Sequence, residues 1–165
     1  MPSGGVHPIT NKPIGPLGGG RSGGQAYLDK GSDGFRRTFT RPPISLADLA
    51  SEMATKLPSK SIRVVGRPDL MISRIVNIGH DIAGVLNAFA IGDVAICPEI
   101  REWDSIEYTR DVMATTGDKA LILIAHERGE EDGMLLCRDW LQKLVPERKV
   151  TFIDSGEPFI NIPSA

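Results

Sequence analysis

Apolar and polar positions alternate in blocks along this 165-residue chain, and the blocks predict strands and helices in turn. Unbroken apolar runs such as 94–97 and 120–125 are typical of strands buried on both faces of a parallel sheet. The segments between them repeat their apolar residues every three or four positions, as amphipathic helices do. Four strands from residue 71 onward, separated by helices, give a βαβαβαβ order and predict a layered α/β domain. The predicted strands are 62–65, 71–78, 93–97, 120–125 and 150–153.

Capping signals mark the ends of the predicted helices. Ser45 stands at an N-cap position, Asp48 follows in the first helical turn, and Pro58 stops the helix. A later segment has acidic residues in its first turn and ends before Gly117. The last helix is expected after a tight turn at 126–133, and its apolar positions are 134, 137, 141 and 144. The predicted helices are 46–57, 83–90, 102–114 and 134–144.

Residues 1–43 lack this periodicity and are rich in glycine and proline. Such a segment cannot bury enough apolar surface to offset the entropy lost on ordering, so we predict a disordered tail at 1–43 and an α/β domain at 44–165. Residues 18–23 match the GxGxxG pattern, but no strand precedes them and no helix follows, which argues against a phosphate-binding loop. The basic cluster Arg36, Arg37 and Arg41 has two interpretations, a contact for a phosphate or acidic partner, or a solvated charge run.

Composition narrows the classes of partner. A hydrophobic content of 41% and a charged content of 24% fit one globular domain. A net charge of -2 gives no general affinity for nucleic acid or anionic membrane, and 5% aromatic residues offer no platform for stacking bases. No apolar run approaches the roughly 20 residues that span a bilayer. Cys97 and Cys137 form no CxxC motif, which favours a reducing, cytoplasmic compartment.

Polar residues follow three of the predicted strands. His80 and Asp81 come after the first, Glu99 after the second and His126 after the third. Ligands of open α/β sheets bind beyond the carboxyl ends of the strands, so we expect these residues along one edge. Glu130 is expected in the first turn of the helix that follows His126. The sequence therefore predicts an imidazole and a carboxylate that converge on one point.

The pair His126 and Glu130 has two interpretations. Neutral imidazole and carboxylate are common ligands of zinc, iron and manganese, which favours a divalent metal site with open positions for catalysis. The pattern is not HExxH, because position 130 is Glu. Alternatively, His126 is a hydrogen-bonded histidine at a strand end and Glu130 complements the helix dipole. One histidine and one glutamate cannot hold a metal without further ligands.

The other polar residues at this edge carry weaker signals. Asp81 and His80 precede a predicted helix, where an aspartate acts more often as a cap than as a ligand. Glu99 follows Pro98 in the same kind of position. Trp103 is expected to pack in the core or at its rim rather than to bind a substrate.

Several blocks of the sequence together resemble a known family. From about Pro43 to Phe159 the chain resembles the second half of the dinuclear-metal, hexamer-forming proteins called GTP cyclohydrolase I type 2 homologues, or the NGG-one-interacting-factor-three-like family. The order and the spacing of the blocks agree with that family. The blocks are the helix with Ile62-Arg63-Val64-Val65-Gly66, the stretch Gly92 to Asp104 (GDVAICPEIREWD), the turn His126 to Met134, and Thr151 to Phe159 (TFIDSGEPF).

The resemblance implies roles for three residues. His126 and Glu130 match the His-x-x-x-Glu turn that supplies ligands to the family's two-metal site. Two such metals would lower the pKa of a bridging water and support hydrolysis. Glu99 matches a glutamate beside the site, which implies a supporting or proton-transfer role.

The chain also departs from the family pattern. The family's first half supplies two consecutive histidines and an aspartate, whereas no His-His pair occurs in these 165 residues. Members of the family often have a glycine-rich sequence at the position of residues 79–81 of this chain. They often have a histidine at the position of Trp103. With the unmatched first 43 residues, these departures indicate a truncated domain, either a genuine short protein or a truncated gene model.

Two functions follow as expectations. The first is a metal-binding, hydrolase-like protein whose dinuclear site is incomplete unless a partner chain, such as a symmetry mate, adds ligands. The second is a non-catalytic interaction or regulatory module that retains only the fold and the assembly surface. Both imply a cytoplasmic homo-oligomer, with a protein partner in the second case. The sequence does not specify a substrate.

Overall fold

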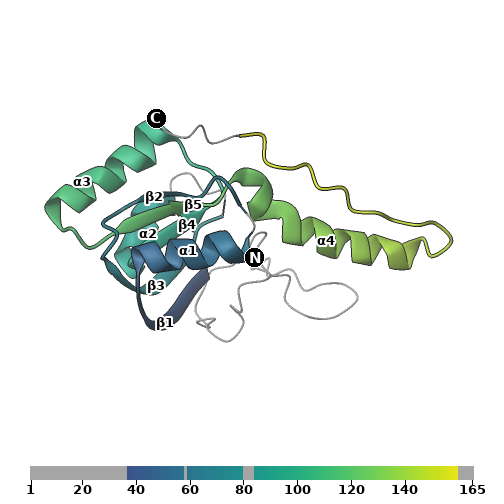
Figure 1. Cartoon of the computed structure of the whole chain (residues 1–165), viewed down its shortest axis with the longest axis horizontal. Helices are drawn as coiled ribbons and strands as arrows, with labels where there is room; N and C mark the ends of the chain where they lie inside the picture. The colour runs from purple at the N-terminus through teal and green to yellow at the C-terminus, as the bar shows by residue number, and fades with distance from the viewer. Residues whose placement is uncertain (1–36, 58, 80–83, 160–165) are drawn as a thin grey trace, which may run out of the picture.

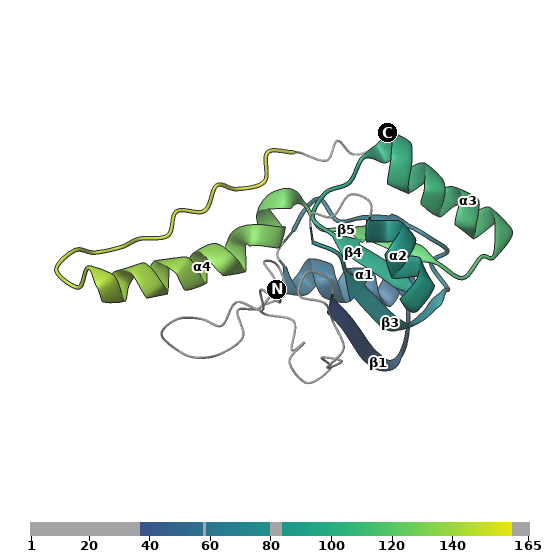
Figure 2. The same cartoon turned by 180° about the vertical axis from the view of Figure 1, so that it is seen from behind.

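The computed structural model describes residues 37–57, 59–79 and 84–159, which form a mixed five-stranded sheet with helices on both faces (Figures 1 and 2). The strand order is β1-β3-β4-β5-β2. The inner pairs, β3 with β4 and β4 with β5, are parallel, and the edge strands β1 and β2 are antiparallel to their neighbours. The strands are β1 (Arg37–Ser45), β2 (Arg63–Val65), β3 (Met71–Asn77), β4 (Val94–Cys97) and β5 (Ala120–Leu123).

The sheet is the centre of the core, because β4 and β5 are buried along their whole length. Successive side chains of a strand point to opposite faces, so the inner strands β3, β4 and β5 each contribute to two hydrophobic clusters. One cluster lies against α1 (Leu46–Lys56), and the other lies against α2 (Gly84–Ile91) and α3 (Glu107–Thr115). The α/β fold and the two buried strands predicted from their apolar runs are therefore confirmed.

The N-cap predicted for α1 is confirmed, whereas Pro58, the predicted stop, lies outside the described residues. The Ser45 hydroxyl accepts a hydrogen bond from the Asp48 backbone amide at 3.1 Å, and α1 ends at Lys56. The helix expected at 102–114 begins instead with a π-helical turn at Glu102–Ile106 and continues as α3. None of the helices in the described ranges is long and apolar enough to cross a bilayer.

The boundary expected at residue 43 is wrong, because β1 already begins at Arg37. This strand pairs with β3, and its register shifts between Thr40 and Ile44, around Pro42 and Pro43. Proline lacks the amide hydrogen that a central strand requires, but an edge strand with an irregular register tolerates it. The two prolines therefore made this segment look unlike a strand in the sequence, although the edge of the sheet accommodates it.

Two further expectations fail near the C-terminal end of the described chain. The expected turn at 126–133 is helical, because α4 runs from His126 to Leu144 without a break. Residues 150–153, expected as the last strand, pair with no strand in the described part of the chain, so the predicted βαβαβαβ order is wrong. Instead, the Gln142 side chain accepts a hydrogen bond from the Val150 amide and donates one to the Arg148 carbonyl. This extended segment runs back along α4, which projects from the sheet (Figure 1).

Candidate metal centre

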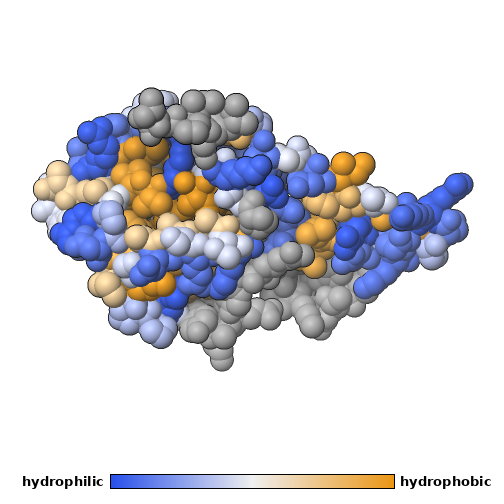
Figure 3. Space-filling view, in the orientation of Figure 1, coloured by the Kyte–Doolittle hydropathy of each residue, from blue (hydrophilic) through white to orange (hydrophobic). Residues whose placement is uncertain are grey.

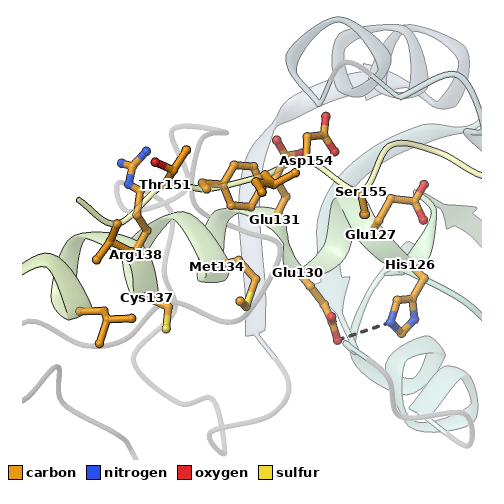
Figure 4. A pocket seen from close by; sticks show the side chains of 14 residues that line it. His126, Glu127, Glu130, Glu131, Met134, Cys137, Arg138, Thr151, Asp154 and Ser155 are labelled. Atoms are coloured by element: carbon orange, nitrogen blue, oxygen red, sulfur yellow. Dashed lines mark ion pairs between the residues drawn. The ribbon is translucent and has the colours of Figure 1, made fainter. Parts of the chain in front are cut away.

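Glu99, His126 and Glu130 meet at the carboxyl edge of the parallel strands, as the sequence predicted. His126 Nδ1 lies 3.1 Å from Glu99 Oε1, and His126 Nε2 lies 3.5 Å from Glu130 Oε1. The two carboxylates therefore sit at opposite nitrogens of one ring. Figure 4 shows the His126 and Glu130 side chains turned toward each other from consecutive turns of α4. The three side chains are 42–56% exposed, so the site is open to solvent.

Two parallel strands bring these residues together. Glu99 follows β4 and His126 follows β5, and the two strands are hydrogen-bonded neighbours in parallel register. The first turn of α4 then packs against the loop after β4 through Gly129, which is buried. A Cβ atom at position 129 would lie only 2.4 Å from Pro98 Cγ. The lack of a side chain at Gly129 therefore allows α4 to approach the loop that carries Glu99.

Ala125, directly before His126, has an unusual backbone conformation. Its φ of 77° and ψ of 145° fall in a region that side chains with a Cβ rarely adopt. It is the only non-glycine residue with positive φ among the described residues. Such strain persists where the surrounding structure imposes it, and it is common at functional sites. The sharp turn from β5 into α4 thus places His126 at the sheet edge at the cost of local strain.

A buried charge cluster holds the same helical turn. The Arg128 and Glu157 side chains are only 10% and 4% exposed, and Arg128 Nε lies 3.3 Å from Glu157 Oε1. Glu157 also accepts hydrogen bonds from the Lys60 backbone amide and, at 2.6 Å, from the Ser61 hydroxyl. Arg128 pairs in addition with Glu131 on the next turn of α4. We call Lys60, Ser61, Arg128 and Glu157 the Glu157 cluster.

The Glu157 cluster keeps both of its buried charges. Burial alone would raise the pKa of Glu157, but hydrogen bonds from Ser61 and the Lys60 amide outweigh it and lower that pKa. Burial would likewise lower the pKa of Arg128, but hydrogen bonds to Glu131 and Glu157 raise it. The cluster therefore ties α4 and the C-terminal segment to the loop before β2 through ionised groups.

The geometry fits part of a metal coordination shell. Ligand atoms about 2.0–2.2 Å from a tetrahedral zinc ion lie roughly 3.5 Å from each other, which is close to the 3.5 Å between His126 Nε2 and Glu130 Oε1. A carboxylate at the other ring nitrogen, as Glu99 is placed, is the usual partner of a metal-binding histidine. Within the described ranges, however, no group of three His, Cys, Asp or Glu side chains could hold an ion. The described residues thus fit two ligand positions and one supporting position.

A groove of about 410 Å³ extends from this site along α4. His126 and Glu130 lie at one end, and Met134, Cys137 and Leu141 follow along the helix. The extended segment 150–155 forms the opposite wall (Figure 4). The candidate centre therefore opens onto an elongated groove with an acidic end and a more apolar end.

The other candidate residues that the structure describes are not part of this cluster. Trp103, expected to pack in the core or at its rim, is 72% exposed, and the Arg101 guanidinium lies over its ring at 5.1 Å. Arg41 pairs with Glu52 of α1 at 2.9 Å. Cys97 lies beneath the site, where burial and then the Glu99 charge raise the pKa of its thiol to about 12, so the thiol is unreactive. The GxGxxG match, Arg36, His80 and Asp81 lie outside the described residues.

Sequence reasoning missed Ala125, Gly129 and the Glu157 cluster. Alanine gives no sign of a positive φ, and a single glycine inside a helical pattern looks only unfavourable. The block Ser155 to Phe159 (SGEPF) marked the region of Glu157, but nothing in it identified Arg128 as the partner.

Comparison with known proteins finds matches only at the level of structure. No protein-family description and no curated protein sequence matches the chain. Staphylococcus aureus protein SA1388 has a similar structure, with a TM-score of 0.59 and 22% identity over 77% of this chain and 42% of that protein. A Bacillus cereus protein related to NIF3 gives a TM-score of 0.58 and 19% identity over 77% of this chain and 36% of that protein.

A third solved structure, protein ybgI of unknown function, gives a TM-score of 0.61 and 21% identity over 76% of this chain and 49% of that protein. This chain spans less than half of each of the three solved chains. Identities below a quarter establish a common fold and not a common activity. The sequence resembled the NGG-one-interacting-factor-three-like family, abbreviated here as NIF3-like. That resemblance is therefore confirmed as a shared fold.

Proposed function

We propose that the chain is a metal-binding, hydrolase-like protein of the NIF3-like family, in which His126 and Glu130 bind a divalent ion. The observation that carries this proposal is the placement of His126 between two carboxylates, with Nε2 facing Glu130 and Nδ1 facing Glu99. Zinc, iron and manganese all accept this combination of ligands. A bound divalent ion would supply Lewis acidity and a more acidic water for hydrolysis.

Glu99 is proposed as a positioning residue. A carboxylate beside Nδ1 favours the tautomer that carries its proton there, which leaves the Nε2 lone pair directed at Glu130. Glu130 is a ligand in this proposal rather than a base. Further ligands must come from outside the described residues, either from this chain or from a second chain in a homo-oligomer.

Metal titration of the purified full chain tests the proposal. We expect the wild type to bind Zn²⁺ or Mn²⁺ in calorimetry, and His126→Ala and Glu130→Gln to lose at least about tenfold in affinity. Glu107→Gln removes an exposed carboxylate of α3 and should leave affinity unchanged. Less than about a tenth of an ion per chain in both the wild type and His126→Ala would overturn the proposal, because two ligands alone bind weakly.

The second candidate function is a non-catalytic interaction module. It is favoured by the lack, within the described ranges, of a three-residue metal cluster, and by the exposed apolar side chains of α4. On this alternative His126→Ala has no effect on partner binding, whereas substitutions on α4 abolish it. The same metal titration separates the two functions.

A further inference from the structure

The helix α4 is attached to the body of the described chain mainly at its first turn. Gly129, in that turn, is its only buried residue, although the helix is 19 residues long. The helix projects away from the sheet (Figure 1), and the surface at its far end is mostly hydrophilic (Figure 3). Little apolar packing therefore fixes the direction of α4, so contacts at its first turn must set where His126 and Glu130 point.

The strained residue Ala125 lies between two peptide groups that are each held by a hydrogen bond. The carbonyl before it, that of Ile124, accepts a hydrogen bond from the Ser59 hydroxyl at 3.3 Å. Its own carbonyl accepts one from the Gly129 amide at 3.2 Å. Because each peptide group is planar, the two groups can turn relative to each other only through φ and ψ of the residue between them. The two hydrogen bonds therefore restrict both dihedral angles of Ala125.

Ser59 is itself held by the Glu157 cluster. The Ser59 side-chain oxygen accepts a hydrogen bond from the Ser61 amide at 3.2 Å. The Lys60 amide and the Ser61 hydroxyl both donate to the Glu157 carboxylate, at 2.9 and 2.6 Å. Glu157 in turn pairs with Arg128 of α4 at 3.3 Å. The loop that contains Ser59 is therefore fixed to the first turn of α4 through a buried ion pair.

These contacts form a closed circuit around the turn that carries His126. The circuit leaves the chain at Ile124 through the Ser59 hydroxyl. It returns through Glu157 to Arg128. Relaxation of the backbone inside the circuit would break hydrogen bonds to partly buried or charged groups, which is costly. We call this circuit the turn clamp, and its members are Ser59, Lys60, Ser61, Ile124, Arg128 and Glu157.

We propose that Ser59 and Glu157 are positioning residues of the candidate metal centre. The turn clamp imposes the positive φ of Ala125, and that conformation places the His126 ring between its two carboxylate partners. Ser59 and Glu157 act through the backbone and not through a contact with the ion. The consequence for metal binding rests on the proposed function, whereas the effect on the turn needs no metal.

A double-mutant cycle between positions 59 and 125 tests the turn clamp without metal. In urea denaturation of the full chain, Ala125→Gly should lower the unfolding constant about fivefold, because it relieves strain. In a Ser59→Ala background the turn relaxes by itself, so Ala125→Gly should change the unfolding constant less than about twofold. The matched control Ser51→Ala removes a hydroxyl-to-carbonyl hydrogen bond of 2.9 Å within α1 and should leave the effect of Ala125→Gly intact. An equal effect of Ala125→Gly in all three backgrounds would overturn the proposal.

Zinc titration of the full chain tests the link between the turn clamp and the metal centre. Ser59→Ala and Glu157→Gln should each weaken Zn²⁺ binding about tenfold, as removal of a group that orients a metal ligand does. Ser59→Thr keeps the hydroxyl and should restore most of the affinity, and Ser51→Ala should leave it unchanged. Equal affinities of the wild type and Ser59→Ala would overturn the positioning role. A wild type that binds no Zn²⁺ would reject the proposed function, and the double-mutant cycle would still decide whether the clamp acts on the turn.

Discussion

Glu99 is the residue on which the orientation of the His126 ring depends most directly, because it lies 3.1 Å from Nδ1. We expect Glu99→Ala to lower metal affinity by about 10- to 100-fold, the usual effect of removing the partner of a metal-binding histidine. Glu99→Gln keeps an oxygen that accepts from Nδ1 and should recover part of the affinity. Calorimetric titration checks this prediction, and equal affinities in all three proteins would show that Glu99 plays no positioning role.

Ala125 is the other residue whose substitution should change stability, because its backbone has a positive φ. Replacement by glycine should relieve the strain of its positive φ, and a small entropic cost partly offsets this gain. We expect Ala125→Gly to raise the free energy of unfolding by about 1 kcal/mol in urea denaturation. The control Ala114→Gly, in the exposed part of α3, should lower it by about the same amount. A loss of stability in Ala125→Gly would mean that the backbone at this position is not strained.

At the scale of elements, the close contact between α4 and the loop after β4 positions the site. Gly129→Ala would place a methyl group 2.4 Å from Pro98 Cγ, so we expect a loss of about 1–3 kcal/mol in stability, although alanine favours helices. Metal affinity should fall as well, because Glu99 is next to Pro98. Adding Pro98→Ala should restore part of both losses. A fully stable Gly129→Ala variant would show that the contact is loose.

The Glu157 cluster connects α4 to the C-terminal segment and makes the stability of the fold depend on pH. The pKa of Glu157 is lowered in the folded chain, so its contribution to stability is present above the ordinary value of 4.5 and disappears as pH falls through the folded pKa. We expect Glu157→Gln to cost about 2 kcal/mol at pH 7, because a charged hydrogen-bonding group is lost. The difference in the free energy of unfolding between the wild type and Glu157→Gln should shrink toward zero in acid. Urea denaturation from pH 7 to pH 3 measures it, and a constant difference would contradict this assignment.

At the scale of the whole molecule, local sequence patterns predicted those parts of the fold that depend on interactions between residues close together in the sequence. The buried runs of β4 and β5, the Ser45 cap and the convergence of Glu99, His126 and Glu130 followed from apolar periodicity and parallel topology. The edge strand β1 depends on pairing with a distant strand, and its prolines hid it. Residues 150–153 have β propensity, but they pair with no described strand. They lie along α4 instead, where Gln142 accepts a hydrogen bond from the Val150 amide. Ala125 and Gly129 acquire their roles only from tertiary contacts.

Nitrogen-detected NMR of the histidine rings tests the central claim most directly. On addition of one equivalent of Zn²⁺ to the full chain, the Nε2 resonance of His126, assigned by its absence in His126→Ala, should shift strongly. The Nδ1 resonance should keep the signature of a protonated nitrogen, because Glu99 faces it. Glu130→Gln should weaken the response. A His126 ring that does not respond to the metal, or one that binds it through Nδ1, would contradict the account.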